Sequence, residues 1–164
     1  TQKNKRFDPR VLAVPVGSTV AFPNLDPFFH NVFSLFDGRR FDLGLYEAGA
    51  SRNVNFPRAG VCYVFCNIHP EMSAIVVVVD TPYYAVTGVN GAFSIENVPP
   101  GRYKLTVWHQ SAKPNAPLPG EVNVAAGGLT LPPFQLSDSG PLALPHKNKY
   151  GRDYDPVQPG PSYK

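Results

Sequence analysis

The stretch Cys66-Asn67-Ile68-His69-Pro70-Glu71-Met72 is the most informative part of this 164-residue chain. It lies between two apolar runs, residues 61–65 and 75–79, whose length and composition predict buried strands. A thiol, an imidazole and a thioether recur at every third position, so a tight loop can direct all three side chains toward a common centre. Soft sulfur ligands combined with imidazole select copper over magnesium or calcium. The stretch therefore predicts a copper-binding loop that joins two strands.

A trigonal copper site also needs a second imidazole, which must come from another part of the chain. His30 is the obvious candidate because it directly precedes residues 31–35, a segment that predicts a strand. His109 belongs to a later β unit and His146 to a polar tail, so both are less suitable. Two imidazoles, one thiolate and a weak axial thioether form the trigonal site of blue copper centres. The predicted ligands of one copper ion are His30, Cys66, His69 and Met72.

Cys62 raises a competing interpretation, in which two thiolates share a pair of copper ions. The ligand set is similar to the two-copper centre of cytochrome oxidase, which has three residues between its second cysteine and its histidine, whereas this chain has two. Four strand residues span about 13 Å, which is too far for both sulfurs to bridge one metal pair. The same separation excludes a Cys62–Cys66 disulfide, which needs Cα atoms within about 7 Å. We expect Cys62 to be a buried free thiol on the same side of the strand as Cys66.

Short apolar or alternating segments separated by turn residues continue toward the N-terminus. The strands predicted before the copper loop are residues 11–16, 19–22, 31–35, 52–56 and 61–66, and residues 75–79 follow it. Residues 37–51 contain three glycines and predict a long loop. Short strands at this spacing, with no helix of any length between them, indicate an all-β sandwich.

The pattern of strands and turns starts again near residue 80. The further predicted strands are residues 84–87, 93–95, 103–108, 122–124 and 129–136, with an Asn-Gly turn between the first two. A unit of about 57 residues is near the lower limit for independent folding, so we expect it to pack on the first domain. Tyr83, Tyr84 and Trp108 are the expected contacts. The predicted divisions are a copper domain at 1–80, a β module at 81–137 and a Pro-, Lys- and Tyr-rich tail at 138–164.

Composition excludes several classes of partner. The net charge of +3 is small and evenly spread, which argues against nucleic acid binding. No apolar run reaches the length of a membrane span, so we expect no membrane crossing in these residues. Two cysteines do not make a disulfide scaffold.

The first half of the chain resembles the cupredoxins, particularly plastocyanin and amicyanin, over roughly residues 5–79. The resemblance lies in His30-Asn31-Val32 at a strand start and in the short loop from Cys66 to Met72, including Pro70. It implies a Greek-key β-sandwich with one type 1 copper ion. We expect the Asn31 side chain to hydrogen-bond the backbone beside Cys66 and hold the loop in shape. The short segment before the first strand and the long 35–53 loop depart from the family pattern.

The second unit resembles the transthyretin-like regulatory domains found beside carboxypeptidases. The matching stretches are residues 89–95 and 98–105. Such modules are structural, which implies a small transthyretin-like β-sandwich packed against the copper domain. The whole arrangement resembles bacterial proteins labelled methylamine-utilisation proteins.

These observations favour one-electron transfer by a protein that is not an enzyme. A redox protein or a larger electron-transfer complex would dock near His69, where Pro70, Phe28 and Phe29 give an apolar rim. The alternative is a structural or accessory subunit of a larger extracytoplasmic or membrane assembly, with copper idle or lost. Copper carriage is disfavoured by the single Met, and a multicopper enzyme by the four His. The expected location is periplasmic or extracellular, with any membrane attachment supplied by a part outside residues 1–164.

Overall fold

The computed structural model describes residues 1–35, 39–111, 120–136 and 146–154. Within these ranges all regular structure is β-strand, which confirms the predicted all-β class. None of the described residues belongs to a helix of the length and apolarity that a membrane crossing requires.

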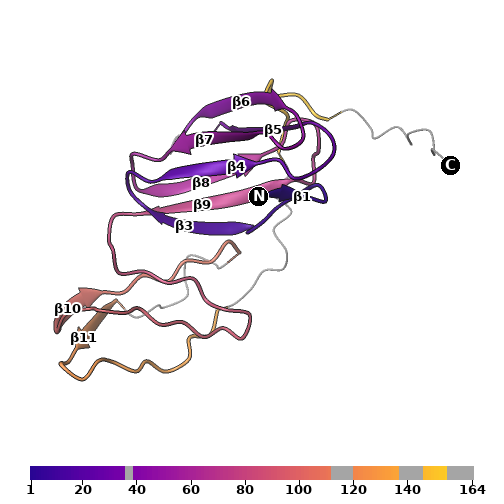
Figure 1. The fold of residues 1–164 in the computed structure, drawn as a ribbon. Coiled ribbons are helices and arrows are strands. Elements are labelled where there is room, and N and C mark those ends of the chain that lie inside the picture. The colour runs from indigo at the N-terminus through magenta and orange to yellow at the C-terminus, as the bar shows by residue number, and fades with distance from the viewer. Residues whose placement is uncertain (36–38, 112–119, 137–145, 155–164) are drawn as a thin grey trace.

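A five-stranded sheet forms one layer of the first domain (Figure 1). Its strand order is β3-β9-β8-β5-β6, where the strands are Val11–Pro15, Ser73–Val79, Gly60–Phe65, His30–Ser34 and Phe41–Tyr46. Strands β3 and β9 are parallel, and the other pairs are antiparallel. Cys62 pairs with Val76 and Phe65 with Ser73, so the copper loop is the hairpin connection between β8 and β9.

A second layer covers this sheet and closes the sandwich. It contains the antiparallel pair β4 (Thr19–Pro23) and β7 (Ser51–Asn55), beside the short pair β1 (Gln2–Lys3) and β2 (Arg6–Phe7). One continuous core cluster joins the layers, with Phe22, Val54 and Phe56 on one side and Val32, Val64 and Val76 on the other. Burial of these apolar side chains is the main stabilising contribution to the sandwich.

A buried hydrogen-bond network anchors the N-terminus to this core. The Gln2 amide donates to the Tyr46 hydroxyl, which donates to the Phe22 carbonyl at 2.9 Å. Burial raises the pKa of Tyr46 to about 12, so the hydroxyl keeps its proton. The segment before the first predicted strand is short for the family, and the structure shows that it forms the paired strands β1 and β2.

The prediction of one loop over residues 37–51 is wrong, because strand β6 occupies Phe41–Tyr46. The pairing of β5 with β6 shifts register between Asn31 and Phe33, and Gly44 has a φ of 69°. This irregularity breaks the simple alternation by which a strand is recognised. The glycine that predicted a loop is thus part of a bulged strand.

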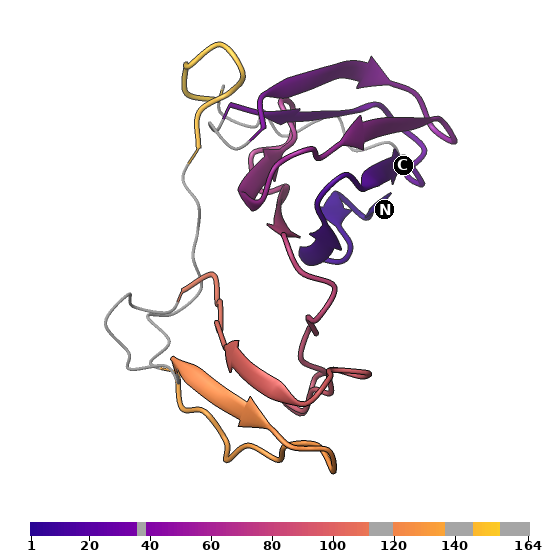
Figure 2. The same cartoon turned by 90° about the vertical axis from the view of Figure 1, so that its left-hand side faces the viewer.

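The second unit contains one antiparallel pair among its described residues, β10 (Gly101–Lys104) and β11 (Glu121–Val124) (Figure 2). The predicted turn at residues 89–91 is present, since the Gly88 N–H donates to the Ala92 carbonyl at 2.9 Å. The segments 84–87, 93–95 and 129–136, which were expected to be strands, are not strands. Tyr83 packs edge-on against Tyr103 within the unit. The domain division remains a prediction, and part of the predicted tail lies outside the described residues.

Candidate metal centre

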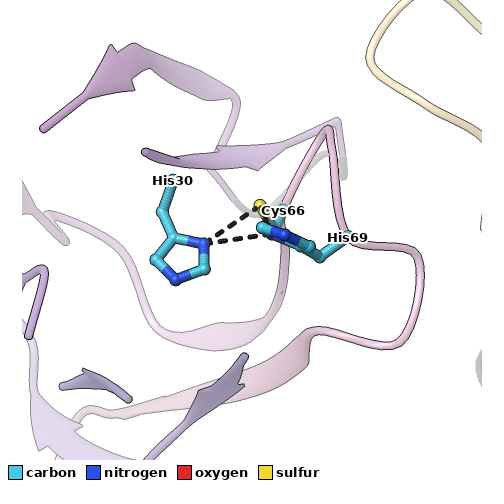
Figure 3. Close-up of side chains that lie close together, drawn as sticks. All are labelled: His30, Cys66 and His69. Atoms are coloured by element: carbon cyan, nitrogen blue, oxygen red, sulfur yellow. Dashed lines mark hydrogen bonds between the residues drawn. The ribbon is translucent and has the colours of Figure 1, made fainter. Parts of the chain in front are cut away.

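Three side chains that the sequence predicted as ligands converge at one end of the sandwich (Figure 3). His30 Nδ1 lies 3.1 Å from His69 Nδ1 and 3.9 Å from Cys66 Sγ. His69 Nδ1 lies 3.6 Å from the same sulfur. Ligand atoms that share one ion at about 2.0–2.3 Å lie roughly 3–4 Å from one another. Both the spacing and the donor types therefore fit a copper ion.

Three different parts of the chain position these ligands. His30 is the first residue of β5, Cys66 directly follows β8, and His69 lies in the loop between β8 and β9. The Cys66 N–H donates to the Met72 carbonyl at 3.2 Å, and the Met72 N–H donates to the His69 carbonyl at 3.0 Å. These bonds tighten the loop so that the sulfur and the second imidazole meet.

Met72, the last residue of the copper loop, is fully buried and belongs to the core cluster. A buried thioether in this position is compatible with both core packing and weak axial ligation. Its role as the fourth ligand stays a prediction.

Asp26 is a functional residue that sequence reasoning missed. Its buried carboxylate lies 2.8 Å from His30 Nε2, so this nitrogen carries a proton and donates it, which leaves the Nδ1 lone pair facing the cluster. Burial acts to raise the pKa of Asp26, but hydrogen bonds from His30 and from the Lys5 and Asn4 backbone outweigh it and lower that pKa. The carboxylate is therefore ionised at neutral pH. The sequence signal was an acidic residue within a turn just before the histidine.

The Cys66 thiol is buried but surrounded by donors. Burial raises the pKa of Cys66, while backbone N–H groups of Asn31, Ile68 and His69 donate to the sulfur and partly offset the shift. These groups stabilise the thiolate, the form that binds metal. A metal ion would complete the deprotonation that the peptide groups favour.

His69 forms the partly exposed edge of the cluster. Burial and the neighbouring His30 lower the pKa of His69, so its imidazole is neutral and can act as a ligand at neutral pH. The Phe28 ring lies against both imidazoles, with centroids 5.2 Å from His30 and 5.7 Å from His69. Phe28 and Ile68 are exposed apolar side chains around this edge, and Phe29, the residue before His30, is exposed as well.

Asn31 supports the site in a different way from the one predicted. Its side-chain amide donates to Asp42 Oδ1 at 2.7 Å and to the Gly44 carbonyl at 3.0 Å on β6. The backbone N–H of Asn31, and not its side chain, faces Cys66. The reason is the register shift between β5 and β6, which brings Asp42 and Gly44 beside Asn31.

Cys62 lies outside the cluster of possible metal ligands found among the described residues. It is a buried free thiol, as predicted, and its sulfur donates to Ser34 Oγ at 3.4 Å. His109 instead accepts a hydrogen bond from the Ser111 N–H at 3.2 Å in the second unit. Neither residue reaches the site around Cys66.

His146, a residue of the predicted tail, lies against the copper loop. Its ring stacks on Phe65 at 4.0 Å between centroids, and its Nε2 donates to the Pro70 carbonyl at 2.9 Å. Little in the sequence predicts this contact, because the surrounding residues have no hydrophobic period.

Comparison with family models finds one match, over residues 78–130, to the model described as polysaccharide lyase family 4, domain II. This match covers the second unit and leaves the metal centre outside it. The transthyretin-like resemblance of the same residues remains a prediction. No curated protein matches the chain.

Several solved structures are similar to the first half of the chain. A purple cupredoxin from Nitrosopumilus maritimus is 29% identical over 46% of this chain and 84% of its own, with a TM-score of 0.43. A reduced variant of amicyanin is 25% identical over 46% of this chain and 75% of its own, with a TM-score of 0.44. A copper-containing nitrite reductase from Thermus scotoductus is 28% identical over 47% of this chain and 21% of its own, with a TM-score of 0.44. The similarity to each extends over slightly less than half of this chain.

Proposed function

We propose that this chain is a type 1 copper protein that transfers single electrons. The observation that supports this most is the convergence of His30 Nδ1, His69 Nδ1 and Cys66 Sγ at one point. Two imidazoles and one thiolate are the equatorial set of blue copper sites. Met72 is proposed as the weak axial ligand.

When bound at this site, copper would supply the one-electron couple. The chain holds the ligands in place through β5, the end of β8 and the hydrogen-bonded loop between β8 and β9. A rigid ligand set limits the rearrangement that accompanies a change of charge. Four protein ligands leave no open coordination position, so we do not assign substrate turnover to this site.

The proposed electron port is the partly exposed edge of His69. Phe28 and Ile68 surround it with exposed apolar area, which suits transient docking of a redox protein. Lys5 lies over the Phe28 ring at 5.7 Å and adds a positive charge near this edge. The proposed location is outside the cytoplasm, periplasmic or extracellular.

A second candidate function is that of an accessory subunit in a larger electron-transfer assembly. Exposed apolar side chains on the second unit favour it, because a partner would remove them from water. They are Val86, Val89, Phe93 and Leu129. In this alternative the unit at 81–137 is a transthyretin-like structural module that contacts the partner.

Addition of copper(II) to the metal-free protein tests the proposal. We expect an intense blue, purple or green colour from thiolate-to-copper charge transfer, which saturates at one copper per chain. A colourless product with only a weak type 2 signal in paramagnetic resonance would contradict the electron-transfer function. The accessory-subunit function would then be the remaining candidate.

A further inference from the structure

Residues 146–154 (yellow in Figure 1) form hydrogen bonds with the copper loop. The Tyr154 hydroxyl donates to the Cys66 carbonyl at 2.8 Å, and His146 Nε2 donates to the Pro70 carbonyl at 2.9 Å. The Lys149 N–H donates to Asn67 Oδ1 at 2.8 Å. Three separate groups of one segment thus bond a loop that carries three of the four predicted ligands, Cys66, His69 and Met72.

The tyrosine and the histidine act as one pair. Tyr154 Oη lies 3.0 Å from His146 Nδ1, and their rings meet edge-on with centroids 5.2 Å apart. The stack of His146 on Phe65 fixes the pair to the last residue of β8. Burial raises the pKa of Tyr154, with the nearby Cys66 as a smaller cause, so its hydroxyl remains a donor.

A further bond connects the same segment to β6, the neighbour of the strand that carries His30. Lys149 Nζ lies 2.7 Å from Asp42 Oδ2, and Asp42 Oδ1 accepts from the Asn31 side chain at 2.7 Å. Asn31 is the neighbour of His30 and directs its own N–H at the Cys66 sulfur. The segment therefore bonds the copper loop directly, and it reaches Asn31, the neighbour of His30, through Asp42.

We propose that residues 146–154 are a clamp on the copper centre, with Tyr154 and His146 as positioning residues. The clamp restricts the backbone at Cys66 and Pro70 and thereby fixes the sulfur and the His69 imidazole relative to each other. The role of the clamp at a copper centre rests on the proposed function. The hydrogen bonds that restrict the loop backbone join protein groups only, so they do not require the metal. The competing interpretation is a surface contact that leaves the loop unaffected.

Amide hydrogen exchange in the metal-free, full-length protein tests the restriction. Tyr154→Phe removes the hydroxyl that bonds Cys66, and Tyr103→Phe is the matched control because its hydroxyl makes a similar bond, to the Pro99 carbonyl at 2.9 Å, in the second unit. Loss of one such hydrogen bond should make the Cys66 and Met72 amides exchange on the order of fivefold faster. Amides of β9 should be unchanged, which shows that the fold is intact.

A second variant and a second measurement separate this inference from the proposed function. His146→Phe keeps a ring that can stack on Phe65 but loses the hydrogen bond to the Pro70 carbonyl. It should also accelerate amide exchange in the copper loop. This variant keeps the clamp testable if Tyr154→Phe does not fold. In copper-loaded protein, Tyr154→Phe should shift the thiolate-to-copper band, while Tyr103→Phe should not. Loop exchange and band position equal to those of the control would overturn the clamp. A wild-type protein without the band would instead overturn the proposed function.

Discussion

Cys62 lies on β8 and Cys66 follows four residues later, just beyond the end of that strand. Both belong to the core cluster, and both are buried free thiols. Burial raises the pKa of each. They differ in what surrounds the sulfur. Cys66 lies beside the Nδ1 atoms of His30 and His69, whereas Cys62 lies beside the Ser34 hydroxyl and, at 3.7 Å, the Arg39 carbonyl.

The comparison shows that burial and strand position do not make a cysteine into a metal ligand. The difference comes from other parts of the chain, which bring two imidazoles to one thiol and an oxygen pair to the other. Backbone donors add to the contrast, because three N–H groups are directed at Cys66. We therefore expect the Cys66 sulfur to bind copper and the Cys62 sulfur not to bind it.

The largest expected effect follows from Cys66→Ser. This change removes the thiolate that charge transfer requires, so the intense visible band should be lost completely. The absorption spectrum with one equivalent of copper(II) measures it. Retention of the band would show that another sulfur, and therefore Cys62, binds the metal.

Asp26→Asn should have the next largest effect. It weakens the hydrogen bond that holds the His30 tautomer, and the loss of such partners typically lowers metal affinity 10–100-fold. Competition with a chelator of known affinity measures the change, and Asp80→Asn on the exposed surface is the control. Equal affinities of the two variants would show that Asp26 only stabilises the fold.

Met72→Leu tests the fourth ligand. The band should remain, and the reduction potential should rise by about 60 mV, equivalent to a tenfold gain in preference for the reduced ion. The rise follows because a donor to copper(II) is removed, and voltammetry measures it. Complete loss of copper binding would contradict the weak axial role.

Cys62→Ser should have the smallest effect on the metal. The band should keep its position and intensity, since the sulfur lies among oxygen atoms and outside the cluster. The free energy of unfolding should fall by about 1 kcal/mol, because a more polar group is buried. Loss of colour in this variant as well as in Cys66→Ser would revive the two-thiolate site.

The meeting of His30, Cys66 and His69 was predictable because it depends on short-range features. A three-residue spacing inside a loop and a histidine at a strand start both appear directly in the sequence. The strands on either side of the loop were predictable for the same reason, since β8 and β9 are strongly apolar.

Other features depend on contacts between distant residues and left weaker signals. Strand β6 was missed because its bulge at Gly44 breaks the alternation. The clamp by Tyr154 joins residues 88 positions apart, and nothing local marks it. In the second unit, alternating patterns at 84–87 and 93–95 predicted strands, yet the structure has only a turn between them. Strand propensity there lacks a partner sheet to pair with.

X-ray absorption at the copper edge of the loaded wild-type protein tests the central claim most directly, because it reports the ligand atoms themselves. The structure predicts one short sulfur ligand and two imidazole nitrogens around a single copper, without a neighbouring copper. Two sulfurs shared by a pair of copper ions, or a shell of nitrogen and oxygen alone, would contradict the site built from His30, Cys66 and His69.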